Sequence, residues 1–400
     1  MPNDAARGDE PVVRHDRDDA RYVLRGHDAG SPDAGSPDAG PAGAESADDA
    51  APRAPVDGTI AVWAPGAPAP RRSGRALPIA LIAVAALLLL ALAAFATTLV
   101  IVSQQAAGNP FRDRALFVDP DSNAARAATG SGTEAQRAAA SRIAESPAAI
   151  WLTPERVRPG TASDAVADTV AQATAAGALP VFVVYGITDR DCGGFSSGGL
   201  PRDEYLDWVD EIAAGLGDRT SIVVLEPDSL ALASECPDPE ARTALVRSAL
   251  ERFSGTGAEV YLDGGHSAWL PAADMAELLR AAGVDQARGF ATNVSNAQAT
   301  EAESAYAARV SDALGGAHAI VDTSRNGAGP PADGQWCNAP DLALGEAAHA
   351  VDDPVVDAVL WVKPPGESDG TCNGGPAAGT WWPEQAEELV ANADRLAGGS

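Results

Sequence analysis

The sequence predicts an α/β fold, a distorted TIM-like (β/α) barrel with seven or eight parallel strands. From about residue 108 onward, short apolar runs alternate with longer stretches rich in Ala, Glu and Arg. The short runs are apolar almost throughout, which is typical of parallel strands covered on both faces. No GxGxxG or Walker loop follows the early runs, so a doubly wound open sheet is the less favoured alternative.

The short runs are the predicted strands, and the stretches between them are the predicted helices. The strands cover 115–119, 149–152, 180–186, 221–226, 259–263, 288–293, 319–323 and 358–363. The helices include 162–175, 203–215, 239–253, 271–282 and 301–314. In a parallel barrel the carboxyl ends of all strands meet at one rim, so polar residues that follow the strands converge there.

Residues 1–75 have a different composition from the predicted barrel. They are rich in Ala, Pro, Asp and Gly, and they contain the repeat DAGSPDAGSPDAGPAG over 28–43. Large apolar residues are too few here to offset the entropy lost on ordering the chain. We therefore expect a disordered tail.

Residues 76–102 contain no charged side chain and are long enough to cross a bilayer as a helix. Arg71, Arg72 and Arg75 precede them, which places the tail in the cytoplasm and the barrel, residues 103–400, outside the cell. The alternative is a signal peptide cut near 94–96. The apolar run continues past that point, so an uncleaved single-pass membrane anchor is favoured.

Charge and cysteine content narrow the classes of function. A net charge of −28 argues against nucleic acid as a partner, whereas a neutral polysaccharide is not repelled. None of the four cysteines forms a CxxC pair, so a zinc site has little support. No metal and no cofactor are expected. Two disulfides in an oxidising compartment are expected; three pairings are possible, of which neighbours in sequence order is the simplest. A monomer is expected.

Polar side chains follow six successive predicted strands. They are Tyr185 and Asp191, Glu226 and Asp228, Asp263 and His266, Asn293 and Asn296, Asp322 and Arg325, and Lys363, Glu367 and Asp369. A single Asp after a strand is usually a helix cap. Six strand ends in succession instead indicate an active site on one rim.

Paired carboxyl groups without a metal-ligand cluster suit hydrolysis of a glycosidic bond, in which one carboxylic acid protonates the leaving oxygen. Trp151, Trp269 and Trp336 lie near these motifs and are candidates for stacking on sugar rings, with a place in the core as the alternative. Trp208 and Trp361 are expected in the core. Ser229 lacks a GxSxG turn and His266 lacks an HExxH partner, so serine and metal hydrolases fit less well.

Several motifs in order resemble glycoside hydrolase family 6, the inverting cellulases. They are NPF (109–111), LFVDPDS, DRDC (189–192), LEPDSLA (225–231), YLDGGHSAW (261–269), GFATNVSN (289–296), IVDTSRNGAGP (320–330), WCN (336–338) and VKPPGESDGTC (362–372). The resemblance covers the chain from about Asn109 onward, and it implies a distorted β/α barrel that hydrolyses β-1,4-glucan.

The resemblance also implies roles for individual residues. Asp228 is similar to the general acid, and Asp191 to a second carboxylate that raises the pKa of that acid. Tyr185 is similar to a tyrosine that presses on a distorted sugar, Ser197 to a serine that holds the water, and Asp369 to a disputed general base. The implied substrate-binding residues are Trp151, Asp263, His266, Trp269, Asn293, Trp336, Lys363 and Glu367.

The cysteine pairing that the resemblance implies is Cys192 with Cys236 and Cys337 with Cys372. The sequence departs from the family pattern at Gly186, where a polar residue is usual, and at Phe117, where Tyr is common. Neither departure removes a carboxylate.

Loop length bears on the mode of action. The stretches 192–205 and 369–381 are short, whereas processive exo-acting relatives have long insertions at these places. An open cleft and endo action are therefore expected. The alternatives are an exo-acting cellobiohydrolase and an inactive glucan-binding wall protein, of which the second is disfavoured by the intact Asp191, Asp228 and Asp369.

Overall fold

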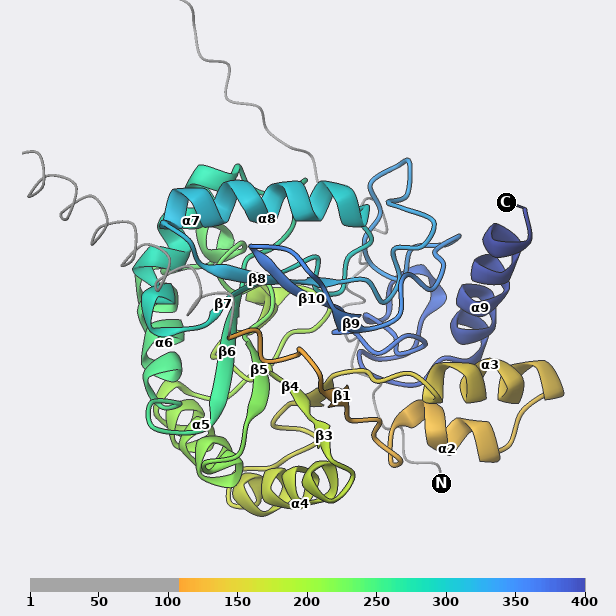
Figure 1. Cartoon of the computed structure of the whole chain (residues 1–400), viewed down its shortest axis with the longest axis horizontal. Helices are drawn as coiled ribbons and strands as arrows, with labels where there is room; N and C mark the ends of the chain where they lie inside the picture. Colours follow the sequence, from red (N-terminus) through yellow and green to blue (C-terminus); the bar gives the residue numbers. More distant parts are fainter. Residues whose placement is uncertain (1–107, 400) are drawn as a thin grey trace, which may run out of the picture. The chain divides into compact units, whose positions relative to one another are not determined.

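The structure, a computed structural model, describes residues 108–399, and a curled eight-stranded sheet forms the centre of this part (Figure 1). The strand order is β2-β4-β5-β6-β7-β8-β10-β9. The strands are β2 (Ile150–Leu152), β4 (Val181–Val184), β5 (Ser221–Leu225), β6 (Ala258–Asp263), β7 (Gly289–Thr292), β8 (His318–Asp322), β9 (His349–Ala350) and β10 (Val356–Leu360). Every pair is parallel except β9 with β10. The α/β class is confirmed, with seven parallel strands.

The two ends of the parallel sheet meet at one point. A parallel bridge joins Ala148, just before β2, to Trp361, just after β10. The Ala149 amide donates to the Trp361 carbonyl at 2.9 Å, and Trp151 Nε1 donates to the Val362 carbonyl at 2.8 Å. The sheet thus curls into a half-barrel whose two sides are joined by a single bridge rather than by a ladder of paired residues, so the predicted barrel is confirmed only in part.

The predicted strand at 115–119 is wrong as a member of this sheet. Only β1 (Ala115–Leu116) forms, and it pairs with β3 (Ala178–Leu179) in a separate two-stranded sheet. The Phe117 amide donates to the Leu179 carbonyl at 2.9 Å, and the pairing ends there. From Val181 onward, β4 pairs with β2 on one side and β5 on the other, so no edge of β4 is left for residues 117–119.

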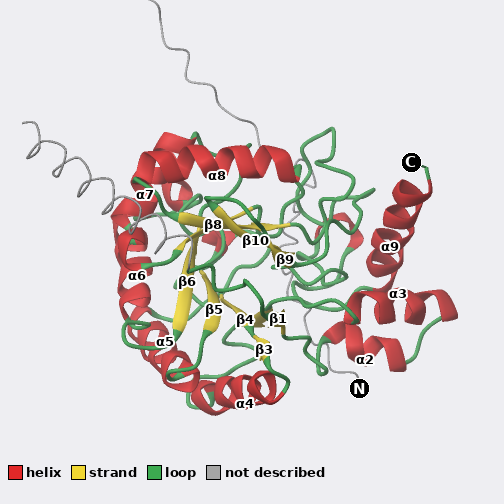
Figure 2. Ribbon diagram, viewed as in Figure 1, coloured by secondary structure: helices red, strands yellow, loops and turns green. Residues whose placement is uncertain are grey.

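Five helices cover the outside of the curled sheet (Figure 2). They are α4 (Ala162–Ala175), α5 (Arg202–Leu216), α6 (Pro239–Glu251), α7 (Ala272–Ala281) and α8 (Thr300–Leu314). The predicted ranges agree with them to within about two residues, the usual uncertainty of helix ends. Between β8 and β9 the described chain forms no helix, so this part of the barrel wall is made of loops.

Three further helices lie beside the seam and were not predicted. They are α2 (Asn123–Thr129), α3 (Glu134–Ala144) and α9 (Pro383–Gly398). Ser122 caps α2, and Thr133 with Gln136 forms a capping box at the start of α3. Helix α3 packs against α9, and Arg142 pairs with Asp394 at 2.8 Å.

The core has one layer on each face of the sheet and a third apolar cluster, which contains Trp361. Phe182 and Val184 of β4 point outward into the layer beneath the helices, where Trp208 has no exposed surface. Val181 and Val183 point inward to the layer that fills the barrel, together with Tyr261. Trp361 is also buried, as predicted for it and for Trp208. Strands buried on both faces explain their continuous apolar sequences.

Among residues 108–399, no helix is long and apolar enough to span a membrane. The predicted tail at 1–75 and the predicted anchor at 76–102 lie outside the described residues.

Candidate active site

The predicted site residues lie at or just beyond the carboxyl ends of the strands. Tyr185 follows β4, Asp228 follows β5, Asp263 ends β6, Asn293 follows β7 and Lys363 follows β10. Parallel strands bring these positions to one rim. Glu226, Asp228 and Asn293 have positive φ angles of 50°, 68° and 65°. Such angles are uncommon outside glycine and accompany sharp turns that direct side chains away from the sheet.

Asp228 is partly exposed and lies among other carboxyl groups. Burial raises the pKa of Asp228 well above its ordinary value, and the charges of Asp263, Asp191 and Asp369 raise it further, against the opposing effect of Lys363. A carboxyl group with a raised pKa keeps its proton to higher pH and is suited to donate it. Asp228 therefore has the electrostatic setting of a general acid.

Asp263 lies directly beneath Asp228. Its Oδ2 accepts from the Asp228 amide at 2.8 Å and from the Gly265 amide at 3.2 Å. The side chain is 1% exposed, and burial raises its pKa to about 7. Asp263 thus fixes the backbone of Asp228 and adds negative charge near it. The contact of Asp263 with substrate stays a prediction, and its buried position does not favour such a contact.

Glu226 lies on the other side of the same turn and is 1% exposed. Its two carboxylate oxygens accept from the Gly186 and Ile187 amides at 3.0 and 3.2 Å. Burial raises its pKa to about 7, although these bonds act in the opposite direction. Glu226 therefore ties the turn after β5 to the loop after β4.

Asp191 occupies a short loop after β4, at a φ angle of 63°. Its Oδ2 accepts from the Ser196 amide at 2.6 Å, while burial raises its pKa. Ser197 is exposed on the same loop, with its amide donating to the Gly194 carbonyl at 3.3 Å. The structure therefore brings the predicted second carboxylate and the predicted water-holding serine onto one loop.

Asp369 is 5% exposed and is surrounded by donors. Its Oδ2 accepts from Arg325 Nη1 at 2.8 Å and from the Asn338 amide at 2.9 Å, while Lys363 Nζ lies 3.3 Å from Oδ1. Although burial opposes ionisation, the charges of Arg325 and Lys363 hold the pKa of Asp369 below its usual value. A carboxylate paired in this way is a weak base.

Two aromatic rings and two cations line the rim next to the seam. The rings of Trp151 and Tyr185 meet edge to face with centroids 5.3 Å apart. Arg190 lies over the Tyr185 ring at 4.7 Å, and Lys363 Nζ lies 5.5 Å from the centre of the Trp151 ring. Arg190 also pairs with Glu155 at 3.1 Å. These contacts fix the orientation of Tyr185 and Trp151.

The loops after β6 and β7 hold three of the predicted substrate-binding residues. His266 and Trp269 are partly exposed and pack together with ring centroids 5.4 Å apart, and burial lowers the pKa of His266 to about 4. Asn293 has no exposed surface. Its amide nitrogen donates to the Asp322 and Gln298 carbonyls, and its oxygen accepts from the Gln298 amide. Asn293 is placed to hold the loop rather than a sugar.

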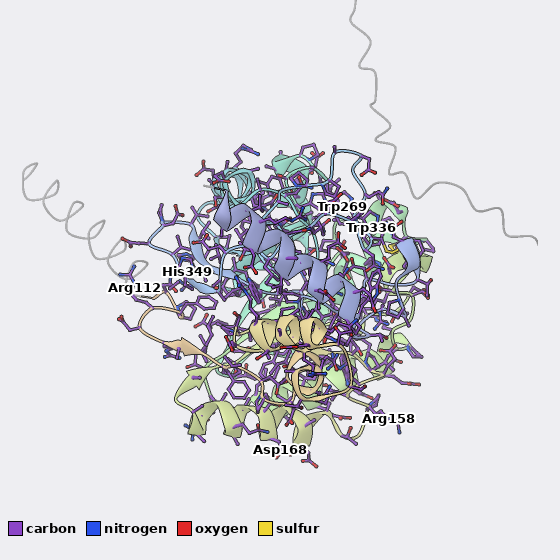
Figure 3. All side chains as sticks on the ribbon, turned by 90° about the vertical axis from the view of Figure 1, so that its right-hand side faces the viewer. Arg112, Arg158, Asp168, Trp269, Trp336 and His349 are labelled. Atoms are coloured by element: carbon purple, nitrogen blue, oxygen red, sulfur yellow. A yellow bond between two sulfur atoms is a disulfide. The ribbon has the colours of Figure 1, made fainter. Side chains whose placement is uncertain are left out.

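The remaining two predicted binding residues, Trp336 and Glu367, lie in the loops after β8 and β10. Trp336 is partly exposed and packs against Phe195 with centroids 6.0 Å apart; Figure 3 labels it together with Trp269. Glu367 is 5% exposed and accepts from Asn123 Nδ2 at 2.6 Å.

Both predicted disulfides are present. Cys192 is bonded to Cys236 and Cys337 to Cys372, with Cα–Cα distances of 5.4 and 6.1 Å. The first joins the loop that carries Asp191 to the loop after β5. The second joins the loop that contains Trp336 to the loop after Asp369. Both bonds thus connect loops that bear site residues.

The model of the family described as glycosyl hydrolases family 6 matches residues 111–393. The chain belongs to this family.

Relatives and solved structures agree with this membership. Endoglucanase A of Cellulomonas fimi is 44% identical over 70% of this chain, which spans 61% of that relative's length. A probable 1,4-beta-D-glucan cellobiohydrolase C of Aspergillus niger is 34% identical over 72% of this chain and 78% of its own length. The structure of endoglucanase Cel6 from Mycobacterium tuberculosis is 41% identical, with a TM-score of 0.68, and covers 72% of this chain and 100% of that one.

Two residues of this family 6 site, Arg190 and Asn338, were not singled out from the sequence, and Arg325 was predicted at the rim without a role. Arg190 orients Tyr185, while Arg325 and Asn338 hold Asp369. Arg190 precedes Asp191 in the DRDC motif, Arg325 follows β8 in TSRNG, and Asn338 ends WCN. Each lies inside a motif that was recognised. The motifs therefore located these residues, but they did not show which side chain each one contacts.

Proposed function

We propose that this chain hydrolyses β-1,4-glucosidic bonds with inversion, with Asp228 as the general acid. The observation that carries the proposal is the setting of Asp228, which is partly exposed at the rim, where burial and the surrounding carboxyl groups raise its pKa. Protonation of the leaving oxygen is the step that such a group accelerates.

The attacking water would be held by Asp191 and Ser197 rather than by Asp369. Asp191 and Ser197 share one loop, and Ser197 is exposed. Asp369 is engaged by Arg325, Lys363 and Asn338. Its proposed role is electrostatic, since its negative charge lies in a site where an oxocarbenium-like transition state develops positive charge.

The substrate and endo action are inferred from relatives and from loop length. The bacterial relative of greater identity is an endoglucanase, while the fungal relative at 34% is a probable cellobiohydrolase. The rim loops at 192–205 and 369–381 are short. One observation favours the exo alternative, since Phe195 packs against Trp336 from the opposite loop. Rapid loss of viscosity of a soluble cellulose derivative, relative to the reducing ends formed, supports endo action; a slow loss favours exo action.

The location at the cell surface is proposed from the sequence alone. The apolar segment at 76–102 would anchor the chain, and external protease should release an active fragment containing residues 111–393. Recovery of the whole activity from the medium, in a chain cut near residue 96, would replace this proposal with a cleaved signal peptide.

The decisive test is the variant Asp228→Ala. Loss of general acid catalysis should lower hydrolysis of unactivated β-1,4-glucan by roughly 10²–10⁴-fold, measured as reducing sugar released. The first product from a β-linked oligosaccharide should be the α-anomer, observed by proton NMR before mutarotation. A β-anomer would indicate a covalent intermediate and overturn the inverting mechanism. Unchanged activity of the variant would overturn the role of Asp228.

A further inference from the structure

The segment 186–189 lies between β4 and the loop that carries Asp191, and two buried charged side chains hold its backbone. Glu226 accepts from its first two amides at 3.0 and 3.2 Å. Arg242 donates through Nη2 to the carbonyls of its last two residues at 3.1 and 2.6 Å. Arg242 thus binds the part of the segment that lies nearest to Asp191.

Arg242 lies near the start of helix α6 and is 7% exposed. Asp238 caps this helix, because its side chain accepts from the amide three residues later at 2.9 Å. Just before the cap, Cys236 is bonded to Cys192, the residue after Asp191. The end of the helix that carries Arg242 is therefore fixed close to the loop that its guanidinium binds.

The Asp191 loop adopts backbone conformations that need support. Asp189, Asp191 and Cys192 have positive φ angles of 49°, 63° and 44°. Such conformations cost free energy and persist only where the surrounding contacts hold them. A hydrogen bond from a charged donor is stronger than one from a neutral donor, so Arg242 is suited to supply this support at Asp189.

Arg242 also contributes a positive charge near Asp191. Burial raises the pKa of Asp191, and the bond from the Ser196 amide lowers it. The charges of Arg190 and Arg242 lower it further, although Arg190 is paired with Glu155 at 3.1 Å. The charged and titratable groups that face Asp191 are Arg190 on its own loop, Tyr185 after β4, Asp228 after β5 and Arg242 on α6. Among these groups, Arg242 is the cation that comes from outside the Asp191 loop.

We propose that Arg242 is a positioning residue for Asp191, holding from helix α6 the segment that leads to this carboxyl group. The inference rests on the proposed hydrolysis and extends it, because Asp191 is the group proposed to hold the attacking water. A carboxylate must be ionised to accept a hydrogen bond from that water on either oxygen, and the charge of Arg242 favours this form. Arg242 lies outside the motifs recognised in the sequence, in the stretch between 231 and 261.

The test measures kcat/KM on a soluble β-1,4-glucan across a range of pH, with the full-length chain. Arg242→Gln removes the charge and should move the acidic limb to higher pH by roughly half a unit to one unit, because Asp191 then ionises less readily. Arg242→Lys retains the charge and should leave the limb in place. Arg247→Gln is the matched control, since it removes the same charge from an exposed position on the same helix.

Hydrogen exchange measured by mass spectrometry tests the loop directly. The Arg190 amide donates to the Gly198 carbonyl, and the Ser196 amide donates to Asp191. Peptides that cover 188–198 should therefore be protected in the wild type. Arg242→Gln should speed their exchange about tenfold or more, the effect of losing a charged donor, and leave the strands unchanged.

The acidic limb and the exchange pattern decide between positioning and a merely structural role. A limb that stays in place or moves to lower pH in Arg242→Gln, an equal shift in Arg242→Lys or Arg247→Gln, or exchange that rises equally throughout the protein would each overturn the proposal. If Arg242→Gln does not fold, fast exchange of 188–198 in the folded wild type would overturn it. Slow exchange there, with faster exchange in Arg242→Lys, would support it.

The exchange experiment also separates this inference from the proposed function. Failure of the wild type to cleave any β-1,4-glucan would overturn the proposed hydrolysis. Faster exchange confined to 188–198 in Arg242→Gln would still support Arg242 as the residue that holds the Asp191 loop.

Discussion

At the scale of single residues, the carboxyl groups of the rim fall into two classes, those with raised and those with lowered pKa values. Asp228, Asp263 and Glu226 have raised pKa values because burial outweighs the donors around them. Asp369 has a lowered pKa because it is paired with Arg325 and Lys363. When the pKa values of neighbouring carboxyl groups are shifted in opposite directions, one group can be a neutral acid and the other an anion at the same pH.

The first prediction concerns Asp263→Asn and the pH dependence of hydrolysis. A general acid must be protonated, so activity falls as pH rises through the pKa of Asp228. The charge of Asp263 raises that pKa, so its removal should move the alkaline limb of kcat/KM to lower pH. The Asn oxygen can still accept from the Asp228 and Gly265 amides. A loss of rate with an unmoved limb would show that Asp263 acts only in folding.

The second prediction concerns Asp369→Asn. The variant should lose activity, because Arg325 and Lys363 are left without their anion near the reacting sugar. Added azide should restore little of the rate, since no direct base or nucleophile site is vacated. Rates should be measured on an oligosaccharide with an activated leaving group. Strong rescue, with an azide adduct among the products, would make Asp369 a direct participant.

The sequence predicted which residues lie at the rim, but it did not predict the contacts that each of them makes. The order of motifs identified Asp191, Asp228 and Asp369. It could not show that Asp263 and Asn293 lie below the surface, because burial depends on how the loops after β6 and β7 fold over them. It could not pair Asn338 with Asp369 either, because they lie on different loops 31 residues apart.

At the scale of elements, the site depends on loops that are tied to one another. Cys192–Cys236 connects the loops after β4 and β5, and Cys337–Cys372 connects those after β8 and β10. Phe195 packs against Trp336, and a Cβ atom at Gly370 would lie 2.8 Å from that of Phe195. The strands and helices provide the frame, and these links set the positions of Asp191 and Asp369 relative to it.

The third prediction is that loss of either disulfide destabilises the described domain. The bonds close segments of 44 and 35 residues, so loop-closure entropy gives on the order of 4 kcal/mol for each. Urea unfolding of Cys192→Ser/Cys236→Ser and Cys337→Ser/Cys372→Ser proteins should show this loss of unfolding free energy. Equal stability of the wild type and both double variants would contradict the expectation.

The elements themselves were predicted with uneven success. Helices α4 to α8 were predicted because each follows a strand and shows helical spacing. Helices α2 and α3 were not predicted, although Ser122 and the Thr133–Gln136 capping box mark where they begin. Strand β9 contains two residues and pairs only with β10, so its sequence holds too little pattern to reveal it.

At the scale of the whole molecule, titration of buried acids links stability to pH. The fourth prediction is that the free energy of unfolding falls by a few kcal/mol as pH rises from about 4 to 7. Asp263 and Glu226 rise from ordinary values of 3.8 and 4.5 to about 7, so in this window the folded state binds more protons than the unfolded state. Asp369 acts oppositely at lower pH, and His266, whose pKa burial lowers from 6.5 to about 4, acts oppositely inside the window, so the net fall is smaller than the two acids alone would give.

Urea unfolding at a series of pH values measures this dependence. Glu226→Gln should flatten it, because the amide cannot titrate. A stability that rises between pH 4 and 7 would contradict the assignment of raised pKa values to these two acids.

The contact between α3 and α9 has a consequence for synthesis of the chain. Residues 134–144 pack against residues 383–398, so this contact cannot form until the last helix has left the ribosome (Figure 1). Contacts between segments so distant in sequence form late and slowly. The bridge between Ala148 and Trp361 at the seam likewise cannot form until β10 and the residues after it have been synthesised. Nascent chains should therefore stay sensitive to protease until residues 383–398 have left the ribosome.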